Sequence, residues 1–142
     1  DGSEPAERAI AAASELFQPR GAVVLHFWES WAAEAPALAG VSRSVRDMAA
    51  ELDEIADDQS ADMIARGLKL AERDGFEAIA LSERATGPVW KAVLDAADEH
   101  SGAAIVVGSR GLSGISAALG SVSNGVVHHS RRPVLVVPPE EA

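Results

Sequence analysis

The sequence predicts an α/β fold in which a doubly wound parallel sheet, Rossmann-like in type, is covered by helices on both faces. Segments with apolar residues at helical spacing alternate along the chain with short segments that are apolar throughout. Strands that are apolar at every position are typical of parallel sheets buried on both faces. A helix between consecutive strands supplies the right-handed crossover that parallel pairing requires.

Four of the expected elements lie in the first half of the chain. Ser3 can cap the first helix and Pro5 fits its first turn, whereas Pro19 and Gly21 end its pattern. The run Asp57-Asp58-Gln59-Ser60 interrupts the apolar pattern of the second helix, which leaves room for a break or kink. The expected elements are a helix over about 5–18, a strand at Ala22–Trp28, a helix at Val45–Arg73 and a strand at Ala78–Leu81.

The second half repeats the alternation. Thr86-Gly87-Pro88 ends the second strand, and a glycine-rich segment follows the third. The segment 29–44, with Trp31, Pro36 and Gly40, predicts a connection with little regular structure. The expected elements are a helix at Val89–His100, a strand at Ala103–Val107, a helix at Ile115–Ser130 and a strand at Val134–Val137.

Composition bounds the class of protein. With 142 residues the chain is one domain, and with no Cys it excludes disulfide scaffolds, thiol catalysis and Cys-based zinc sites. A net charge of −10 disfavours non-specific binding to nucleic acid. No apolar run reaches the roughly 20 residues of a membrane span, so a cytoplasmic protein without membrane partners is expected.

The segment after the third strand carries the chemistry. It reads Gly108-Ser109-Arg110-Gly111-Leu112-Ser113-Gly114, and Gly120-Ser121 follows within the next helical pattern. A glycine-rich turn entering a helix is an anion site, because the first-turn N–H groups are unpaired and the helix dipole is positive there. A tight turn whose glycines serve backbone geometry alone explains the same residues. The spacing matches neither a P-loop nor G-x-G-x-x-G.

These residues resemble the C-terminal signature of the universal stress proteins, which is a strand, Gly-x-x-Gly, about nine residues, Gly-Ser/Thr, a helix and a final strand led by Pro. The chain has GSRGLSGISAALGSVSNGVVHHSRRPVLVV over Gly108–Val137. DGSEPAERAI, VVLHFWE and GPVWKAVLDAADEHSGAAIVVGSRG are similar to earlier parts of that family. The resemblance implies five parallel strands in the order 3-2-1-4-5, frequent homodimers and, in one branch, ATP bound between the first and fourth strands.

Positions carried over from the resemblance define a candidate ATP site. Asp1 matches a position that contacts the nucleoside, Phe27 lines the adenine pocket, and Val107 and Gly108 lie beside adenine and ribose. Arg110 is the cation inside the glycine-rich segment. The phosphate-binding positions, where N–H groups and the serine hydroxyl receive the oxygens, correspond to Gly111, Gly120, Ser121 and Val122. Mg²⁺ is expected with ATP, without a dedicated protein ligand set, and the edge strand Val134–Val137 is expected to pair across a homodimer.

The chain departs from the family pattern in two ways. Eight residues separate Gly111 from Gly120 where nine are usual, and one residue is about 100° of helix rotation. If the helix absorbs the deletion, Gly120 and Ser121 face away from the phosphates; if Leu112–Gly114 absorbs it, the site survives. The family's first strand, which is the central one, has no counterpart in the sequence. The expectation is therefore a single universal stress protein domain over 1–142 that is N-terminally incomplete.

Two functions are consistent with this pattern. The first is a nucleotide-binding stress or regulatory protein without fast catalysis, because no general base with a positioned partner and no G-x-S-x-G elbow is present. The second is a homodimeric interaction module of the same family that binds no nucleotide. His128-His129 predicts solvated histidines rather than a metal site, since adjacent helical side chains diverge.

Overall fold

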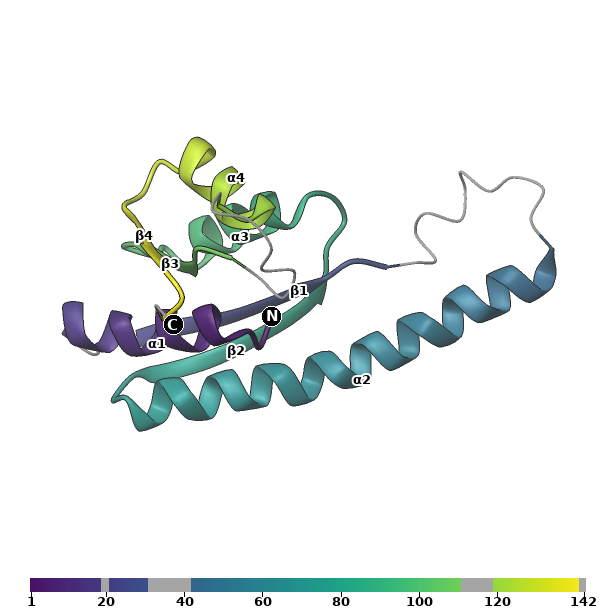
Figure 1. Cartoon of the computed structure of the whole chain (residues 1–142), viewed down its shortest axis with the longest axis horizontal. Helices are drawn as coiled ribbons and strands as arrows, with labels where there is room; N and C mark the ends of the chain where they lie inside the picture. Colours follow the sequence, from purple (N-terminus) through teal and green to yellow (C-terminus); the bar gives the residue numbers. More distant parts are fainter. Residues whose placement is uncertain (19–20, 31–41, 111–118, 141–142) are drawn as a thin grey trace.

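The computed structural model describes residues 1–18, 21–30, 42–110 and 119–140, in which helices and strands alternate (Figure 1). The order is α1 (Glu4–Leu16), β1 (Gly21–Trp28), α2 (Arg43–Arg73), β2 (Glu77–Arg84), α3 (Val89–Glu99), β3 (Ile105–Gly108), α4 (Ser121–His129) and β4 (Val134–Val137). No helix in these ranges is long and apolar enough to cross a membrane.

The strands form two parallel pairs, so the predicted α/β class with parallel strands is confirmed. β1 pairs with β2 from Gly21↔Glu77 to Trp28↔Arg84, and β3 pairs with β4 from Ile105↔Val134 to Gly108↔Val137. Within the described residues no backbone hydrogen bonds join one strand pair to the other, so the two pairs do not form one continuous sheet. The pairings β2-β1 and β3-β4 correspond to 3-2 and 4-5 in the strand order that the resemblance implies, and strand 1 of that order has no counterpart among the described strands.

The start of α1 is fixed by short-range hydrogen bonds. Ser3 is the N-cap, its hydroxyl accepts from the Ala6 N–H at 3.4 Å, and Pro5 occupies the first turn. The same turn lies against the end of β3, because a Cβ at Gly108 would lie 2.8 Å from the Pro5 carbonyl carbon. Glycine at position 108 therefore allows α1 and β3 to approach at the place where the candidate site begins.

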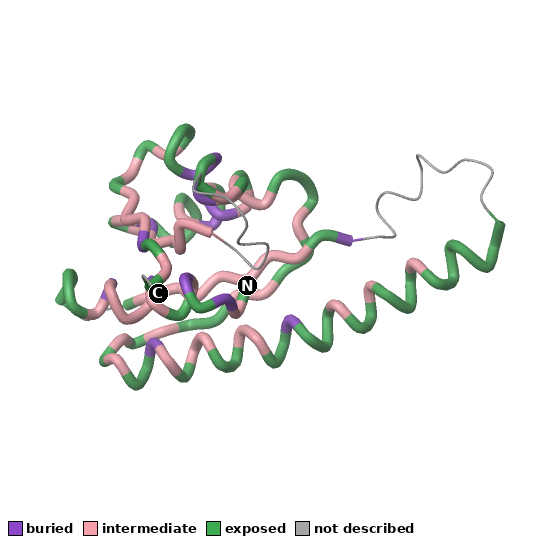
Figure 2. Tube along the Cα trace, in the orientation of Figure 1, coloured by how far each residue is buried: buried purple, intermediate pink, exposed green. Residues whose placement is uncertain are grey.

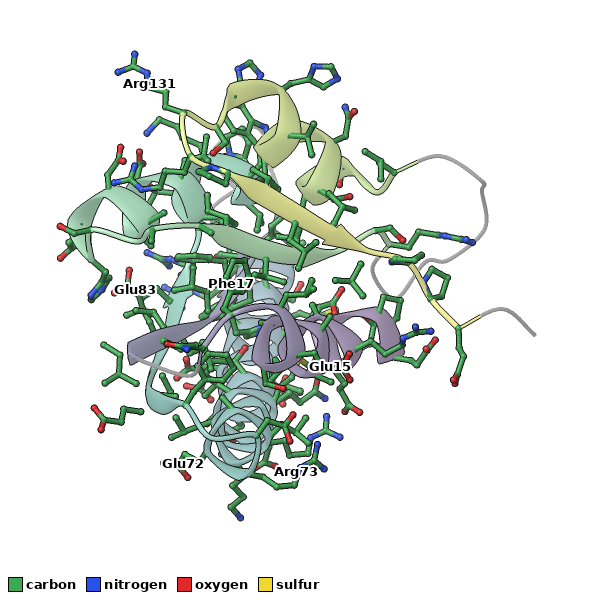
Figure 3. All side chains as sticks on the ribbon, turned by 90° about the vertical axis from the view of Figure 1, so that its left-hand side faces the viewer. Glu15, Phe17, Glu72, Arg73, Glu83 and Arg131 are labelled. Carbon is green, nitrogen blue, oxygen red and sulfur yellow. The ribbon has the colours of Figure 1, made fainter. Side chains whose placement is uncertain are left out.

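α2 runs without a break for 31 residues, so the interruption allowed for at Asp57–Ser60 is absent. Ser60 lies inside the helix, where its hydroxyl donates to the Ala56 carbonyl at 2.7 Å. The carboxyl half packs on β1, and a Cβ at Gly67 would meet Val24 Cγ1 at 3.0 Å. The amino half extends past the strands, as Figures 1 and 2 show. Viewed end-on in Figure 3, α2 forms the layer farthest from α4, with Glu72 and Arg73 on its outer side.

A small apolar core joins α3, β3 and α4. Val93, Ile105 and Val126 are its buried members, and partly buried side chains from β1 and β4 pack around them. α3 and α4 approach closely at Gly125, where a Cβ would lie 2.3 Å from Trp90 Cγ. The Trp90 ring also stacks on His129 with centroids 4.3 Å apart. The close packing of α3 on α4 thus depends on the large Trp90 side chain lying against Gly125, which has no side chain.

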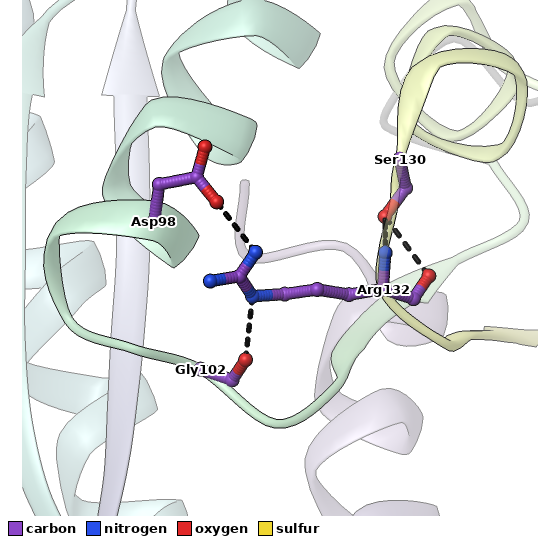
Figure 4. Close-up of polar contacts among 4 residues, drawn as sticks. All are labelled: Asp98, Gly102, Ser130 and Arg132. Atoms are coloured by element: carbon purple, nitrogen blue, oxygen red, sulfur yellow. Dashed lines mark hydrogen bonds and ion pairs between the residues drawn. The ribbon is translucent and has the colours of Figure 1, made fainter.

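Arg132 connects three chain segments near the amino ends of β3 and β4. Its Nε donates to the Gly102 carbonyl at 2.6 Å and its Nη1 donates to Asp98 Oδ1 at 2.5 Å (Figure 4). Ser130 adds two bonds of 3.0 Å to the Arg132 backbone. The turn before β4 is therefore tied to the end of α3 and to the loop that leads into β3.

Two predicted boundaries were wrong. β2 extends to Arg84, beyond the predicted Leu81, because its pairing with β1 continues through Trp28↔Arg84. The last helix begins at Ser121 with Gly120 as N-cap, not at Ile115. Residue 119 is not helical, and 115–118 lie outside the described residues.

Candidate functional site

A cavity of about 1440 Å³ lies between the two strand pairs. Side chains of α1, β1, the carboxyl half of α2, α3 and β3 surround it, and most are apolar. Its polar residues include those at the ends of β1 and β3 and at the start of α4, such as Glu29, Arg110 and Ser121. The volume exceeds the roughly 300–1,000 Å³ of ordinary ligand pockets.

The cavity collects the residues that the sequence singled out. Eight of the nine predicted site residues line it: Asp1, Phe27, Val107, Gly108, Arg110, Gly120, Ser121 and Val122. Gly111, the ninth, lies outside the described residues. Residues separated by more than a hundred positions in the sequence thus line the same cavity.

The amino end of α4 forms the part of the cavity suited to an anion. Gly120 is the N-cap with extended backbone (φ −63°, ψ 161°), no side chain caps the helix, and its first turn holds no acidic residue. The N–H groups of a first helical turn have no intrahelical acceptor, and the dipole is positive there. Gly120 and Ser121 stand at the start of the helix, and both line the cavity.

Hydrogen bonds fix this helix start against the end of β3. The Gly120 N–H donates to the Ser109 carbonyl at 2.8 Å. The Ser123 hydroxyl is 3.0 Å from both the Ser109 and the Gly120 carbonyl oxygens. The Gly120 amide, a predicted phosphate donor, therefore already has an acceptor. No role was predicted for Ser123 from the sequence. The feature that could have indicated one is its place at the third position of a helix without a side-chain cap.

Asp1 lines the cavity just before the start of α1. Its Oδ1 accepts from the Ser3 N–H at 3.1 Å and from the Ser3 hydroxyl at 2.6 Å, so one carboxylate oxygen is engaged in the turn. Burial lowers the pKa of the Asp1 α-amino group. Arg110 is half-buried and also lines the cavity.

His26 is a cavity residue to which the sequence assigned no binding role. Its Nε2 lies 3.1 Å from the Ser60 hydroxyl, which joins β1 to α2. Burial lowers the pKa of His26, and the positive α-amino group of Asp1 lowers it further, so the neutral ring is favoured. Ser60 is 2 % exposed and its hydroxyl donates to the Ala56 carbonyl, so it is no nucleophile.

The described residues offer little to a metal ion. They hold no group of three His, Asp or Glu side chains placed to share one ion. The carboxylates that line the cavity belong to Asp1, Glu7, Glu29 and Glu77. Glu29 lies directly after β1, and no role was predicted for it from the sequence.

The sequence model of the Universal stress protein family matches residues 1–138. The chain belongs to the universal stress protein family. Because the match takes in every described helix and strand, the glycine-rich segment and the helix that follows it are parts of the family's domain. No curated protein sequence matches this universal stress protein.

Solved structures share its α/β fold. Hypothetical protein MJ0577 is 23% identical with a TM-score of 0.79, covering 100% of this chain and 93% of that one. The universal stress protein of Archaeoglobus fulgidus in complex with dAMP is 19% identical with a TM-score of 0.59, covering 95% and 89%. A universal stress protein in complex with cAMP is 23% identical with a TM-score of 0.56, covering 99% and 92%. These likenesses confirm a Rossmann-like fold, and some of these neighbours bind adenine nucleotides.

Proposed function

We propose that this universal stress protein binds ATP in the cavity beside β1, β3 and the start of α4. The observation that carries the proposal is the convergence of eight predicted residues on one cavity with an uncapped helix start at its edge. Structures of family members with dAMP and with cAMP support an adenine nucleotide as the ligand class. The triphosphate is the finer part of the proposal, and it rests on the resemblance of Gly108–Val137 to the ATP-binding branch of the family.

The phosphates would lie at the amino end of α4. The N–H groups of Ser121 and Val122 and the Ser121 hydroxyl are the donors, and Arg110 adds the positive charge. A few charge-assisted bonds of roughly 1.5–3 kcal/mol each supply micromolar affinity after the costs of ordering the ligand. The net charge of −10 does not oppose this strongly, since charges beyond about 8 Å are screened at physiological salt.

The nucleoside would occupy the space closer to the strands. Phe27 and Val107 present apolar surface for adenine, and the ribose would lie beside Gly108, which also lines the cavity. The Asp1 carboxylate keeps one oxygen outside the turn hydrogen bonds described above, and this oxygen can accept from a ribose hydroxyl. Mg²⁺ would neutralise the triphosphate and be held mainly by phosphate oxygens and water, with Asp1 as the nearest protein ligand.

We propose that an apolar strand leading into Asp1 fills the rest of the cavity and joins the two strand pairs into one sheet. The volume of about 1440 Å³ is more than a nucleotide needs, and its walls are mostly apolar. In the described residues β1 pairs only with β2 and β3 only with β4, which leaves one edge of each without a backbone partner.

A homodimer through β4 belongs to the same proposal. β4 is four residues long, apolar throughout, and pairs on one side with β3 among the described strands. An apolar edge strand is a template for pairing with a second chain. The Val134–Val137 edge is therefore the surface through which we expect two copies to associate.

Titration of the full chain with Mg-ATP by calorimetry tests the function. We expect micromolar binding that Gly120→Val removes, because the branched side chain would fill space at the helix start while its extended backbone stays allowed. Gly87→Val is the matched control, since a Cβ there meets nothing within 4 Å and Gly87 lies outside the cavity. Absence of binding by the folded wild-type chain would contradict the proposal.

One observation favours the alternative of a homodimeric module that binds no nucleotide. The Gly120 N–H, a predicted phosphate donor, is already bonded to the Ser109 carbonyl. If that bond persists with ATP present, Ser121 and Val122 must carry the phosphates with Arg110. A dimer without a heat of binding would establish this alternative.

A further inference from the structure

The amino half of α2 carries an exposed apolar stripe. Its four members are Val45, Met48, Leu52 and Ile55, with exposed fractions of 42%, 61%, 42% and 48%. They follow one another at steps of three, four and three residues, the a/d spacing of a helix that packs lengthwise on another helix. We call these four residues the α2 stripe.

The stripe does not face the body of the protein. Ala49 and Ala56 are half-buried and Ser60 is buried, which defines the side of α2 that turns toward the strands. At 3.6 residues per turn, the centre of the α2 stripe lies about 90° around the helix from that side. This part of α2 also projects beyond the strands, as the burial-coloured tube in Figure 2 shows. Apolar side chains in such a place are typical of a surface that binds a partner.

Charges beside the stripe identify the kind of partner. Val45 and Leu52 take the a positions of the heptad. The g positions, which flank the stripe on one side, are Ser44, Glu51 and Asp58. The e positions, which flank it on the other side, are alanines. Between Arg43 and Asp58 the helix holds six carboxylates and two arginines. Arg43 and Arg46 fall at f and b, on the side away from the stripe. The rim of the stripe is therefore acidic.

We propose that the α2 stripe docks a basic amphipathic helix of another protein. The partner helix would set apolar side chains against the four stripe residues and Lys or Arg beside Glu51 and Asp58. A second copy of this chain fits less well, because it would bring two helices of the same acidic character together. The proposal is independent of nucleotide binding, since none of the four stripe residues lines the cavity.

Two synthetic peptides test the docking on the full chain. One is an 18-residue helix with Leu at a and d and Lys at e and g; its counterpart has Glu in place of Lys. Measured by fluorescence anisotropy, the Lys peptide should bind with a micromolar Kd and the Glu peptide should bind at least about tenfold more weakly. Equal binding of both peptides, or binding of neither, would overturn the proposal.

Two double variants distinguish docking of the Lys peptide on the α2 stripe from its general electrostatic attraction to a negatively charged protein. Met48→Glu with Leu52→Glu adds two carboxylates, which strengthens a purely electrostatic association but should weaken docking on the stripe by about tenfold or more. Leu16→Glu with Val127→Glu adds the same charge at exposed sites outside α2, 66% and 42% exposed in the wild type, and should leave the affinity unchanged or slightly higher. Circular dichroism verifies that all variants are folded. Unweakened binding by the stripe variant, or self-association that the stripe variant abolishes, would refute the assignment.

Discussion

Replacing Gly125 with Ala should destabilise the protein by breaking the contact between α3 and α4. A Cβ at position 125 would lie 2.3 Å from Trp90 Cγ, 2.4 Å from Cδ1 and 2.7 Å from Cβ. Carbon atoms prefer separations of roughly 3.5–4.0 Å, so Trp90 must retreat by about 1 Å. The nearest atoms include the Trp90 Cβ, close to the main chain, so a rotation at the far end of the side chain does not relieve the overlap.

The magnitude follows from three terms. Overpacking in a well-packed interior costs roughly 1–3 kcal/mol. Movement of Trp90 also disturbs its stack on His129, a contact of the kind worth about 0.5–1.5 kcal/mol. The higher helix propensity of alanine stabilises the folded state by about 1 kcal/mol and offsets part of this loss. The free energy of unfolding should therefore fall by about 1–3 kcal/mol, which lowers Tm by roughly 3–12 °C for a chain of this size.

Urea and thermal unfolding followed by circular dichroism measure this change. Gly87→Ala is the control, because a Cβ there meets nothing within 4 Å, and its Tm should stay the same or rise slightly. A Gly125→Ala protein as stable as the wild type would show that Trp90 and α4 are not packed as described.

Two further predictions concern stability. Arg132→Ala removes the bonds to Gly102 and Asp98 and should lower the free energy of unfolding by about 1–2 kcal/mol in urea titrations, whereas Arg131→Ala, at an exposed neighbour, should change it by less than about 0.5 kcal/mol. Equal effects of the two variants would contradict the role given to Arg132. The lowered pKa of His26 means that the unfolded chain binds more protons than the folded one, so the free energy of unfolding should fall as pH drops below 6.5. His26→Gln should flatten this dependence between pH 6.5 and 5; an unchanged slope would show that another group causes it.

The sequence was sufficient to predict the fold class, and eight of the nine site residues predicted from it line one cavity. Apolar runs such as Ala22–Trp28 and Val134–Val137 identify buried parallel strands, and the observed strands lie within one or two residues of them at most ends. The glycines after β3 and before α4 predicted where the polar residues of the cavity lie. Short side chains at strand ends let a ligand approach the backbone.

Contacts between distant segments could not be read from the sequence. Nothing local indicates that Trp90 fills the space above Gly125, or that the Ser123 hydroxyl reaches the Ser109 carbonyl. The helix start at Ser121 was missed because the residues before it, such as Ala117 and Leu119, have good helix propensity, whereas the observed boundary depends on the Gly120 N–H bonding back to Ser109. The length of β2 was missed because pairing with β1, rather than apolar character, carries it to Arg84.

The most direct test of the proposed function is a titration of the ¹⁵N-labelled full chain with Mg-ATP, followed through the backbone amide signals. The proposal predicts that the amides of Ser121, Val122 and Gly108 shift first and saturate together at micromolar ATP, while those at the Arg132 end of β4 stay still. Unmoved signals from the start of α4, with shifts elsewhere or none at all, would contradict it.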